Sequence, residues 1–134
     1  MSRVSMIHHL NVQISNRERT QEWYQRVLGV EFIDRGPESN QRQLQLYLGT
    51  AEIHFTEKPE PQAVSSNHFA LEISDWEGML AHLDKLGVCY SKPGTRAHNG
   101  SYYTYIHDPD NNMIELVHHP LGLHWTQTPG IRTT

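Results

Sequence analysis

One pattern of alternating residues occurs twice in this chain of 134 residues, and this duplication is the strongest constraint on its fold. The first copy is residues 8–16 (HHLNVQISN), and the second is residues 67–75 (NHFALEISD). In each copy a histidine precedes apolar residues at every second position, and Ser followed by Asn or Asp ends the stretch. Later segments repeat in the same order: 28–30 with 86–88 (both LGV), and 53–55 (IHF) with 114–116 (IEL). Half of the chain has therefore been duplicated, and we expect an approximate twofold axis to relate the two halves.

Each half is predicted to contain one strand, one helix and then three further strands. A period of two with one apolar face indicates a strand that packs on one side only. The helices are expected to begin after Ser15 and Ser74, each of which stands three residues before a Glu, in the spacing of a capping box. Gly29 and Gly87 stand where C-terminal caps are expected. The predicted strands are residues 6–14, 30–34, 43–48 and 51–56 in the first half, and 67–73, 88–91, 101–106 and 113–117 in the second.

These elements predict an α+β fold of two βαβββ modules in tandem, which form a curved mixed sheet with the helices on its outer face. The modules are expected at residues 6–57 and 67–117, joined by a connector at 58–66, so that residues 1–117 form one domain. Residues 118–134 lack periodicity and are predicted to be a tail over the surface. Three segments rich in Gly, Pro or Asn are predicted to be loops or turns: residues 36–40, 92–100 and 108–111.

The composition argues against several classes of protein. The formal net charge is −4 without any block of like charges, which argues against binding to nucleic acid. No apolar run approaches the ~20 residues that a membrane span requires, and we expect neither a membrane segment nor a secretory signal. The single cysteine, Cys89, cannot form an internal disulfide, which favours a reducing, cytoplasmic location.

Four residues that can bind a metal ion share one strand parity. His9, His54, His68 and Glu115 lie on predicted strands, and each is out of step with the apolar residues of its own strand. Their side chains are therefore expected on the polar face. They also form two repeat-related pairs, His9 with His68 and His54 with Glu115, which a twofold axis would direct toward one region. Three imidazoles and one carboxylate suit one divalent ion per site, such as zinc, nickel, manganese or iron.

Five short motifs stand out: residues 9–12 (HLNV), Tyr24 with 28–29 (LG), 67–71 (NHFAL), 108–111 (DPDN) and 114–116 (IEL). They resemble motifs of the vicinal oxygen chelate superfamily, which includes glyoxalase I, extradiol dioxygenases, fosfomycin-resistance enzymes, methylmalonyl-CoA epimerase and bleomycin-binding proteins. The resemblance covers about residues 6–117. It implies an enzyme in which a divalent ion binds two vicinal oxygens of a small-molecule substrate and stabilises an enediolate-type intermediate as a Lewis acid.

The resemblance also implies roles for individual positions. His9, His68 and Glu115 match the usual metal set of the superfamily, two histidines and one glutamate. His54 stands where glyoxalase I usually has a glutamate, so the chain departs from the two-carboxylate site of that enzyme. The catalytic residue that moves a proton would then be Glu115 or His54.

Further residues are candidates for contact with the substrate. Gln45 and Tyr47 share the polar side of one predicted strand, and Tyr103 and Tyr105 alternate on another. In the superfamily a tyrosine often stands ten residues before the glutamate, which is the position of Tyr105. Ordinary strand packing is the alternative explanation for these tyrosines, because aromatic residues favour strands. Arg96 lies in a loop where related enzymes often hold anionic substrates.

The sequence leaves three main functions open. A glyoxalase-like lyase or isomerase is the leading interpretation. An extradiol-type Fe(II) dioxygenase is the second, because His9, His68 and Glu115 form the two-histidine, one-carboxylate set of such oxygenases. A non-catalytic protein that binds a small molecule or antibiotic is the third, although such relatives generally lack the metal residues. A fosfomycin-type transferase is a weaker fourth, because its characteristic arginine beyond the last strand has no convincing counterpart here.

The resemblance also bears on assembly. In many relatives, halves of two chains pair, and twofold homodimers are the commonest soluble oligomers. We therefore expect a homodimer with two shared sites. Each site would take His9 and His54 from one chain, and His68 and Glu115 from the other.

Overall fold

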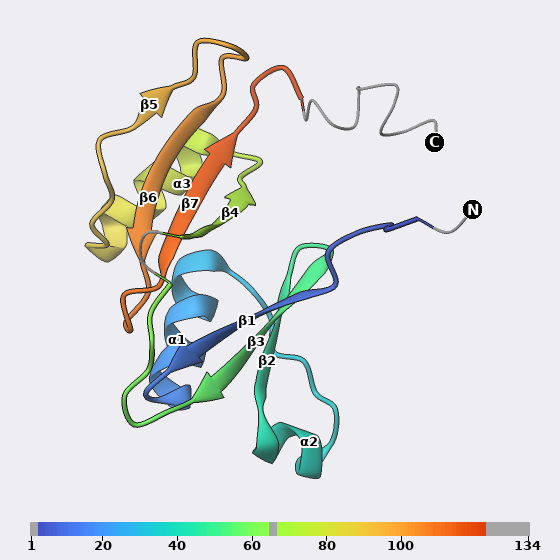
Figure 1. Ribbon diagram of the computed structural model, residues 1–134. Coiled ribbons are helices and arrows are strands. Elements are labelled where there is room, and N and C mark those ends of the chain that lie inside the picture. The colour runs from blue at the N-terminus through green and yellow to red at the C-terminus, as the bar shows by residue number, and fades with distance from the viewer. Residues whose placement is uncertain (1–2, 65–66, 123–134) are drawn as a thin grey trace. The chain divides into compact units, whose positions relative to one another are not determined.

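The computed structural model describes residues 3–64 and 67–122 of the chain, which divides into two units (Figure 1). Unit 1 contains the residues up to 67 together with residues 107–113, and unit 2 contains residues 68–106 and those from 114 onward. No helix in the described part of the chain is long and apolar enough to cross a membrane. Most of the predicted tail lies outside the described residues, which end at residue 122.

Unit 1 is a three-stranded sheet covered by a helix. Parallel pairing joins β1 to β3, antiparallel pairing joins β2 to β3, and the strand order is therefore β1-β3-β2. Helix α1 covers the apolar face of this sheet, where the ring of Tyr24 meets that of Phe55 edge-on at 4.9 Å. The elements of unit 1 are β1 (His9–Ile14), α1 (Arg17–Leu28), α2 (Pro37–Arg42), β2 (Leu44–Leu48) and β3 (Ala51–Glu57).

Unit 2 repeats this plan with four strands in the order β4-β7-β6-β5. The parallel pair β4–β7 corresponds to β1–β3 of unit 1. Helix α3 packs on the apolar side, where Trp76 lies 5.8 Å from the ring of Tyr102 and Leu83 is fully buried. The predicted α+β fold of two related modules is thus confirmed. The elements of unit 2 are β4 (Phe69–Glu72), α3 (Trp76–Leu86), β5 (Gly94–Thr95), β6 (Tyr102–His107) and β7 (Met113–His118).

Both long helices have their N-cap one residue later than predicted. The caps are Asn16 in α1 and Asp75 in α3, and each side chain accepts a hydrogen bond from the amide three residues on, at 2.9 Å and 3.0 Å. The capping boxes predicted at Ser15 and Ser74 are therefore wrong. Asn and Asp are at least as good as Ser at this position, and the hydroxyl of Ser15 instead donates to Asp110 at 2.6 Å.

Two predicted strands are largely absent from the described structure. Residues 30–34 make one isolated bridge to β2 and no continuous ladder. Residues 88–91 form no strand, because the amide of Val88 bonds the carbonyl of Leu83 at 2.9 Å and so completes the end of α3. The short strand β5 forms instead within the predicted loop 92–100, by pairing with β6.

The predicted loop at 36–40 contains the start of helix α2. Pro37 occupies the first turn, where its fixed backbone angle suits a helix and its missing N–H costs nothing. An ion pair between Glu38 and Arg42, at 3.2 Å, joins successive turns. Such exposed pairs contribute little, so this ion pair adds little to the stability of the six-residue helix.

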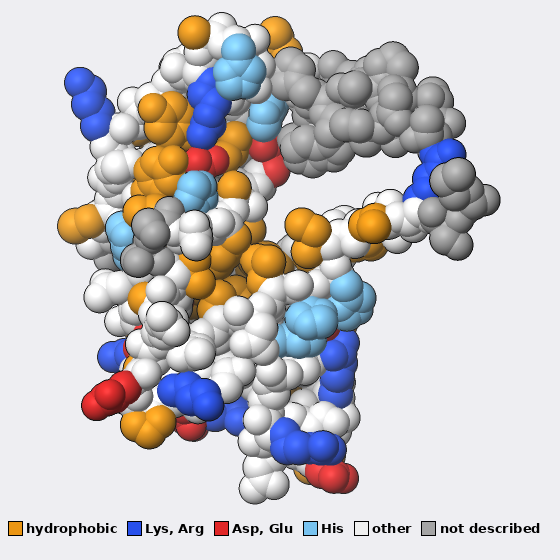
Figure 2. All heavy atoms as spheres, viewed as in Figure 1, with side chains coloured by type: hydrophobic (Ala, Val, Ile, Leu, Met, Phe, Trp, Pro, Cys, Tyr) orange, Lys and Arg blue, Asp and Glu red, His pale blue; other side chains and the backbone are white. Residues whose placement is uncertain are grey.

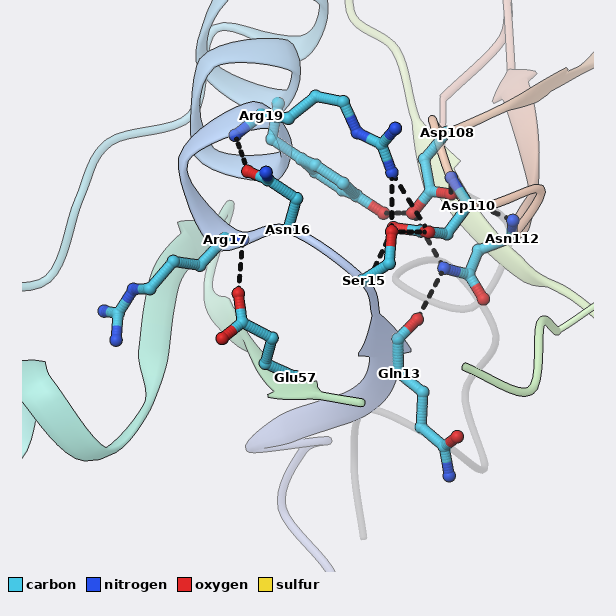
Figure 3. Close-up of polar contacts among 10 residues, drawn as sticks. Gln13, Ser15, Asn16, Arg17, Arg19, Glu57, Asp108, Asp110 and Asn112 are labelled. Carbon is cyan, nitrogen blue, oxygen red and sulfur yellow. Dashed lines mark hydrogen bonds and ion pairs between the residues drawn. The ribbon is translucent and has the colours of Figure 1, made fainter. Parts of the chain in front are cut away.

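The turn at residues 108–112 belongs to unit 1, and it is held by a buried polar network (Figure 3). Asn111 has φ 66°, as a turn residue able to adopt the left-handed region should. The carboxylate of Asp108 is 4% exposed and accepts from the hydroxyl of Tyr24 at 2.7 Å and from the side-chain amide of Asn112 at 2.8 Å. The same Asn112 amide reaches the backbone carbonyl of Gln13 at 3.2 Å, so the turn is fastened to the end of β1.

Candidate metal centre

The polar face of the unit 1 sheet carries two of the four predicted ligands. In the register of β1 and β3, His9 faces Glu52 and Asn11 faces His54, so the two histidines are diagonal neighbours on one face. Their rings are stacked, with centroids 4.1 Å apart and planes 14° from parallel. His54 is 8% exposed, whereas His9 is an exposed residue at the start of its strand. Figure 2 shows histidine side chains gathered in one place on unit 1.

A carboxylate orients the buried histidine. Nε2 of His54 lies 2.8 Å from Oε1 of Glu52, and Arg35 donates to Oε2 of Glu52 at 2.8 Å. The hydrogen bond with His54, helped by Arg35, lowers the pKa of Glu52 despite partial desolvation. An ionised carboxylate can only accept hydrogen bonds, so Nε2 of His54 carries a proton, and Nδ1 is the nitrogen that presents a lone pair when the ring is neutral. A neutral imidazole of this tautomer can bind a cation through Nδ1.

Unit 2 brings the other two predicted ligands together. Glu115 lies on β7 between the buried core residues Ile114 and Leu116, but its side chain points to the opposite, polar face. Its exposure is 6%, and its Oε1 lies 3.5 Å from Nε2 of His68, which immediately precedes β4. The two side chains are therefore neighbours on the polar face of this sheet.

Two of the predicted substrate-contact residues bond Glu115, and a third contacts one of them. Oε1 accepts hydrogen bonds from the hydroxyl of Tyr105 at 2.8 Å and from Nη2 of Arg96 at 3.0 Å. The guanidinium of Arg96 lies 4.3 Å from the centre of the Tyr103 ring, in a cation–π contact. The hydrogen bond to Glu115 raises the pKa of Tyr105, and desolvation adds to this effect. Tyr105 is therefore a neutral hydrogen-bond donor at physiological pH.

A hollow of about 560 Å³ adjoins this group of side chains in unit 2. It combines cationic and aromatic side chains, a lining that suits a small anionic or planar molecule. Figure 2 shows hydrophobic, basic, acidic and histidine side chains intermixed on the face of unit 2 toward the viewer. The hollow is lined by Thr95, Arg96, Ala97, His98, Tyr103 and Tyr105.

Each unit supplies a pair of side chains whose chemistry fits a divalent ion. Ligands about 2.1 Å from one ion lie roughly 3.0–3.5 Å apart, and the separation of 3.5 Å between His68 and Glu115 agrees with such a pair. The stacked rings of His9 and His54 provide two imidazoles in contact with each other. Among the described residues, no group of three or more His, Cys, Asp or Glu side chains is placed to hold a metal ion.

The sequence missed three residues of unit 1 that contact the predicted ligands or their partners. Nδ1 of His8 lies 2.9 Å from Nδ1 of His9, and Glu52 bonds His54. Arg35 bonds both Glu52 and the side chain of Gln45. Glu52 has the same strand parity as His54, which could have identified it, whereas Arg35 lies in an irregular segment without such a signal.

The remaining candidate of unit 1, Tyr47, faces Glu52 across β2 and β3 and is 48% exposed. Gln45 faces His54 in the same register. Both therefore share the polar face with the histidine pair, as their alternation predicted.

The arrangement of two open-sheet modules, each with one polar and one helix-covered face, defines an α+β protein with the glyoxalase type of fold. A family model described as Glyoxalase/Bleomycin resistance protein/Dioxygenase superfamily matches residues 6–116. The chain belongs to this superfamily, also called the vicinal oxygen chelate superfamily, as its motifs indicated.

Solved structures agree on the fold. A protein from Bacillus anthracis described as a glyoxalase family protein has a TM-score of 0.77 at 20% identity, with 89% of this chain and 98% of that chain covered. Lactoylglutathione lyase from Agrobacterium tumefaciens has a TM-score of 0.71 at 18% identity, with 91% and 100% covered. The fosfomycin resistance protein FosX from Listeria monocytogenes has a TM-score of 0.71 at 20% identity, with 89% and 97% covered. The superfamily thus contains many enzymes, and it also contains non-catalytic members.

Proposed function

We propose that this protein is a divalent-metal-dependent enzyme, a glyoxalase-like lyase or isomerase that acts on a small substrate with vicinal oxygens. The observation that carries the proposal is the pair of Glu52 and His54. Histidines that bind metals almost always donate their other ring N–H to an acceptor such as a carboxylate, and Nε2 of His54 lies 2.8 Å from Oε1 of Glu52. Family membership adds support, because members of the superfamily generally use a divalent metal.

The proposed ligands are His9, His54, His68 and Glu115, and the ion supplies Lewis-acid polarisation of the substrate oxygens when bound. Glu115 is the proposed base, since it is a nearly buried carboxylate on the polar face. The neutral hydroxyl of Tyr105 donates to Glu115 and orients its carboxylate. His54 is the second candidate for proton transfer, because it is a nearly buried imidazole on the polar face whose Nε2 lies 2.8 Å from the carboxylate of Glu52.

We further propose a twofold homodimer in which each site takes His9 and His54 from one protomer, and the partner's His68 and the partner's Glu115. Each unit holds one of these pairs by itself, and dimers are common in the superfamily. The test is to mix a His9→Ala, His54→Ala chain with a His68→Ala, Glu115→Ala chain under conditions that permit exchange. Each heterodimer should regain one complete site and bind metal again. A monomer in light scattering, or a mixture that binds no metal, would exclude shared sites.

The reaction class is tested by metal content and turnover together. The protein is purified, its bound metal is measured by mass spectrometry, and it is then stripped and reloaded with Zn²⁺, Ni²⁺, Mn²⁺ or Fe²⁺. We expect isomerisation of a methylglyoxal–thiol adduct with one of the first three ions. Oxygen uptake with a catechol and Fe²⁺ would instead support the dioxygenase alternative. A chain with no affinity for any of these ions would contradict the proposal and favour a non-catalytic binder.

A further inference from the structure

The carboxylate of Glu115 already has a cation beside it. A single oxygen, Oε1, accepts hydrogen bonds from Arg96 at 3.0 Å and from Tyr105 at 2.8 Å, and lies 3.5 Å from Nε2 of His68. Glu115 is almost fully buried, and a buried carboxylate is costly to keep charged without a cation or donors. Arg96 therefore acts as the counter-ion of Glu115 when no metal ion is bound.

Arg96 is also held by a second contact that does not involve Glu115. Its guanidinium lies over the ring of Tyr103 at 4.3 Å. The ring of Tyr103 in turn lies directly against the backbone of β5, because a Cβ atom at Gly94 would come within 2.6 Å of it. Tyr103 is thus a fixed platform on which the guanidinium can remain when its bond to Glu115 breaks.

We propose that Arg96 is a displaceable counter-ion, which Glu115 releases on binding a divalent ion and which then binds the anionic group of a ligand. Arg96 and a metal ion compete for the same carboxylate oxygen. Once released, the guanidinium faces the hollow that it lines together with His98 and Tyr105, and its planar set of donors matches a carboxylate, sulfonate or phosphate group. This inference rests on the proposed function, because it takes Glu115 as a metal ligand.

The consequence is positive coupling between the metal and the anion. In the chain without metal, Arg96 is paired with Glu115, so little positive charge is available to an anion in the hollow and anions bind weakly. The metal-loaded chain has that charge available in the hollow. Because coupling between two binding sites is reciprocal, an anion in the hollow should strengthen metal binding by the same factor.

The first test measures the affinity for Zn²⁺ by competition with a fluorescent chelator. Arg96→Gln removes the competing cation, and Lys92→Gln is the matched control, because it removes one charge from an exposed side chain of the same segment, residues 92–100. We expect Arg96→Gln to bind Zn²⁺ at least threefold more tightly than Lys92→Gln. Circular dichroism establishes that both variants are folded. Equal affinities would overturn the inference.

The second test uses benzenesulfonate, an anion that accepts hydrogen bonds from guanidinium but is a poor metal ligand. Its binding is measured by calorimetry with and without Zn²⁺. In the parent chain we expect at least tenfold tighter binding when Zn²⁺ is present, and in Arg96→Gln we expect no such gain. A gain that persists in Arg96→Gln would place the anion on the metal and overturn the role of Arg96.

The two proposals fail in distinguishable ways. A parent chain that binds no Zn²⁺ would overturn the proposed function and this inference with it. Zn²⁺ binding that depends on Glu115, but does not change on substitution of Arg96, would overturn the inference alone.

Discussion

The hydroxyl of Tyr24 on α1 donates a 2.7 Å hydrogen bond to the carboxylate of Asp108, which follows 84 residues later in the sequence. Both residues are buried, Tyr24 completely. The bond joins the helix of the first module to a turn encoded in the second half of the chain. The bond therefore stabilises unit 1 through a partner that lies far from Tyr24 in the sequence.

We expect Tyr24→Phe to lower the free energy of unfolding by about 1.5–3 kcal/mol, the range for a hydrogen bond to a charged group. The variant keeps the ring and its contact with Phe55, so the change reports the hydroxyl alone. Urea denaturation gives the difference. Tyr90→Phe is the control, because its hydroxyl bonds Asp84 at the surface and its loss should matter much less. Equal losses in the two variants would contradict the assigned importance of the buried pair.

The same pair predicts a dependence of stability on alkaline pH. Burial, and then the negative charge of Asp108, raise the pKa of Tyr24 well above its ordinary value. The folded chain therefore keeps this proton above pH ~10, where tyrosine in the unfolded chain loses it. The contribution to stability is complete below that pH and is lost as the pH rises, with a slope of up to about 1.4 kcal/mol per pH unit.

The measurement is urea denaturation of the parent and Tyr24→Phe between pH 8 and pH 12. The other tyrosines titrate in both proteins, so the difference between the two curves isolates Tyr24. The stability difference should be constant below pH 10 and shrink above it. A difference that is independent of pH would show that Tyr24 ionises alike in the folded and unfolded states.

Substitution of the proposed ligands should weaken metal binding without unfolding the protein. We expect His68→Ala and Glu115→Gln each to weaken metal binding at least about tenfold, the size of effect that substitutions at metal sites commonly have. Both side chains lie on the polar face, so the folded structure should survive, which circular dichroism checks. His107→Ala, at an exposed histidine on β6, is the matched control. Unchanged metal stoichiometry in both ligand variants would end the case for this site.

Substitution of His54 should increase glyoxalase-type isomerase activity. His54→Glu recreates the two-carboxylate arrangement of glyoxalase I, but it also places the new carboxylate beside that of Glu52. We therefore expect the double variant Glu52→Gln, His54→Glu to isomerise a methylglyoxal–thiol adduct faster than the parent, by up to about 10²-fold. Glu52→Gln alone is the control. Good metal binding without any gain in rate would favour a different reaction class.

The alternation of residues was sufficient to predict which side chains share a face. His9 and His54 are neighbours because they lie on the adjacent parallel strands β1 and β3. His68 and Glu115 are neighbours because His68 immediately precedes β4, which pairs in parallel with β7. The parity of β3 also places Glu52 beside His54. The hydrogen bond between the two side chains depends on their rotamers, which the alternation does not encode.

Other features depended on competition between local interactions. The helix caps fell on Asn16 and Asp75, which cap at least as well as serine. In unit 1 the neighbouring Ser15 is also engaged elsewhere, with Asp110. The strand predicted at 88–91 was lost because the backbone of Val88 completes a helix end. The counter-ion role of Arg96 could not be foreseen either, because it requires a loop residue to reach a strand 19 positions away.

The turn at 107–113 also determines when unit 1 can be completed during synthesis. Unit 1 includes this turn, where Asp108, Asp110 and Asn112 bind groups near the end of β1 and on α1. On the ribosome the first module emerges early, yet it lacks these partners until most of the second module has been translated. At about 5–20 residues per second, the stretch from residue 67 to residue 113 takes roughly 2–9 s. During that interval the nascent first module has the hydroxyl of Tyr24 without its carboxylate partner, so unit 1 can be completed only after residue 113 has been synthesised.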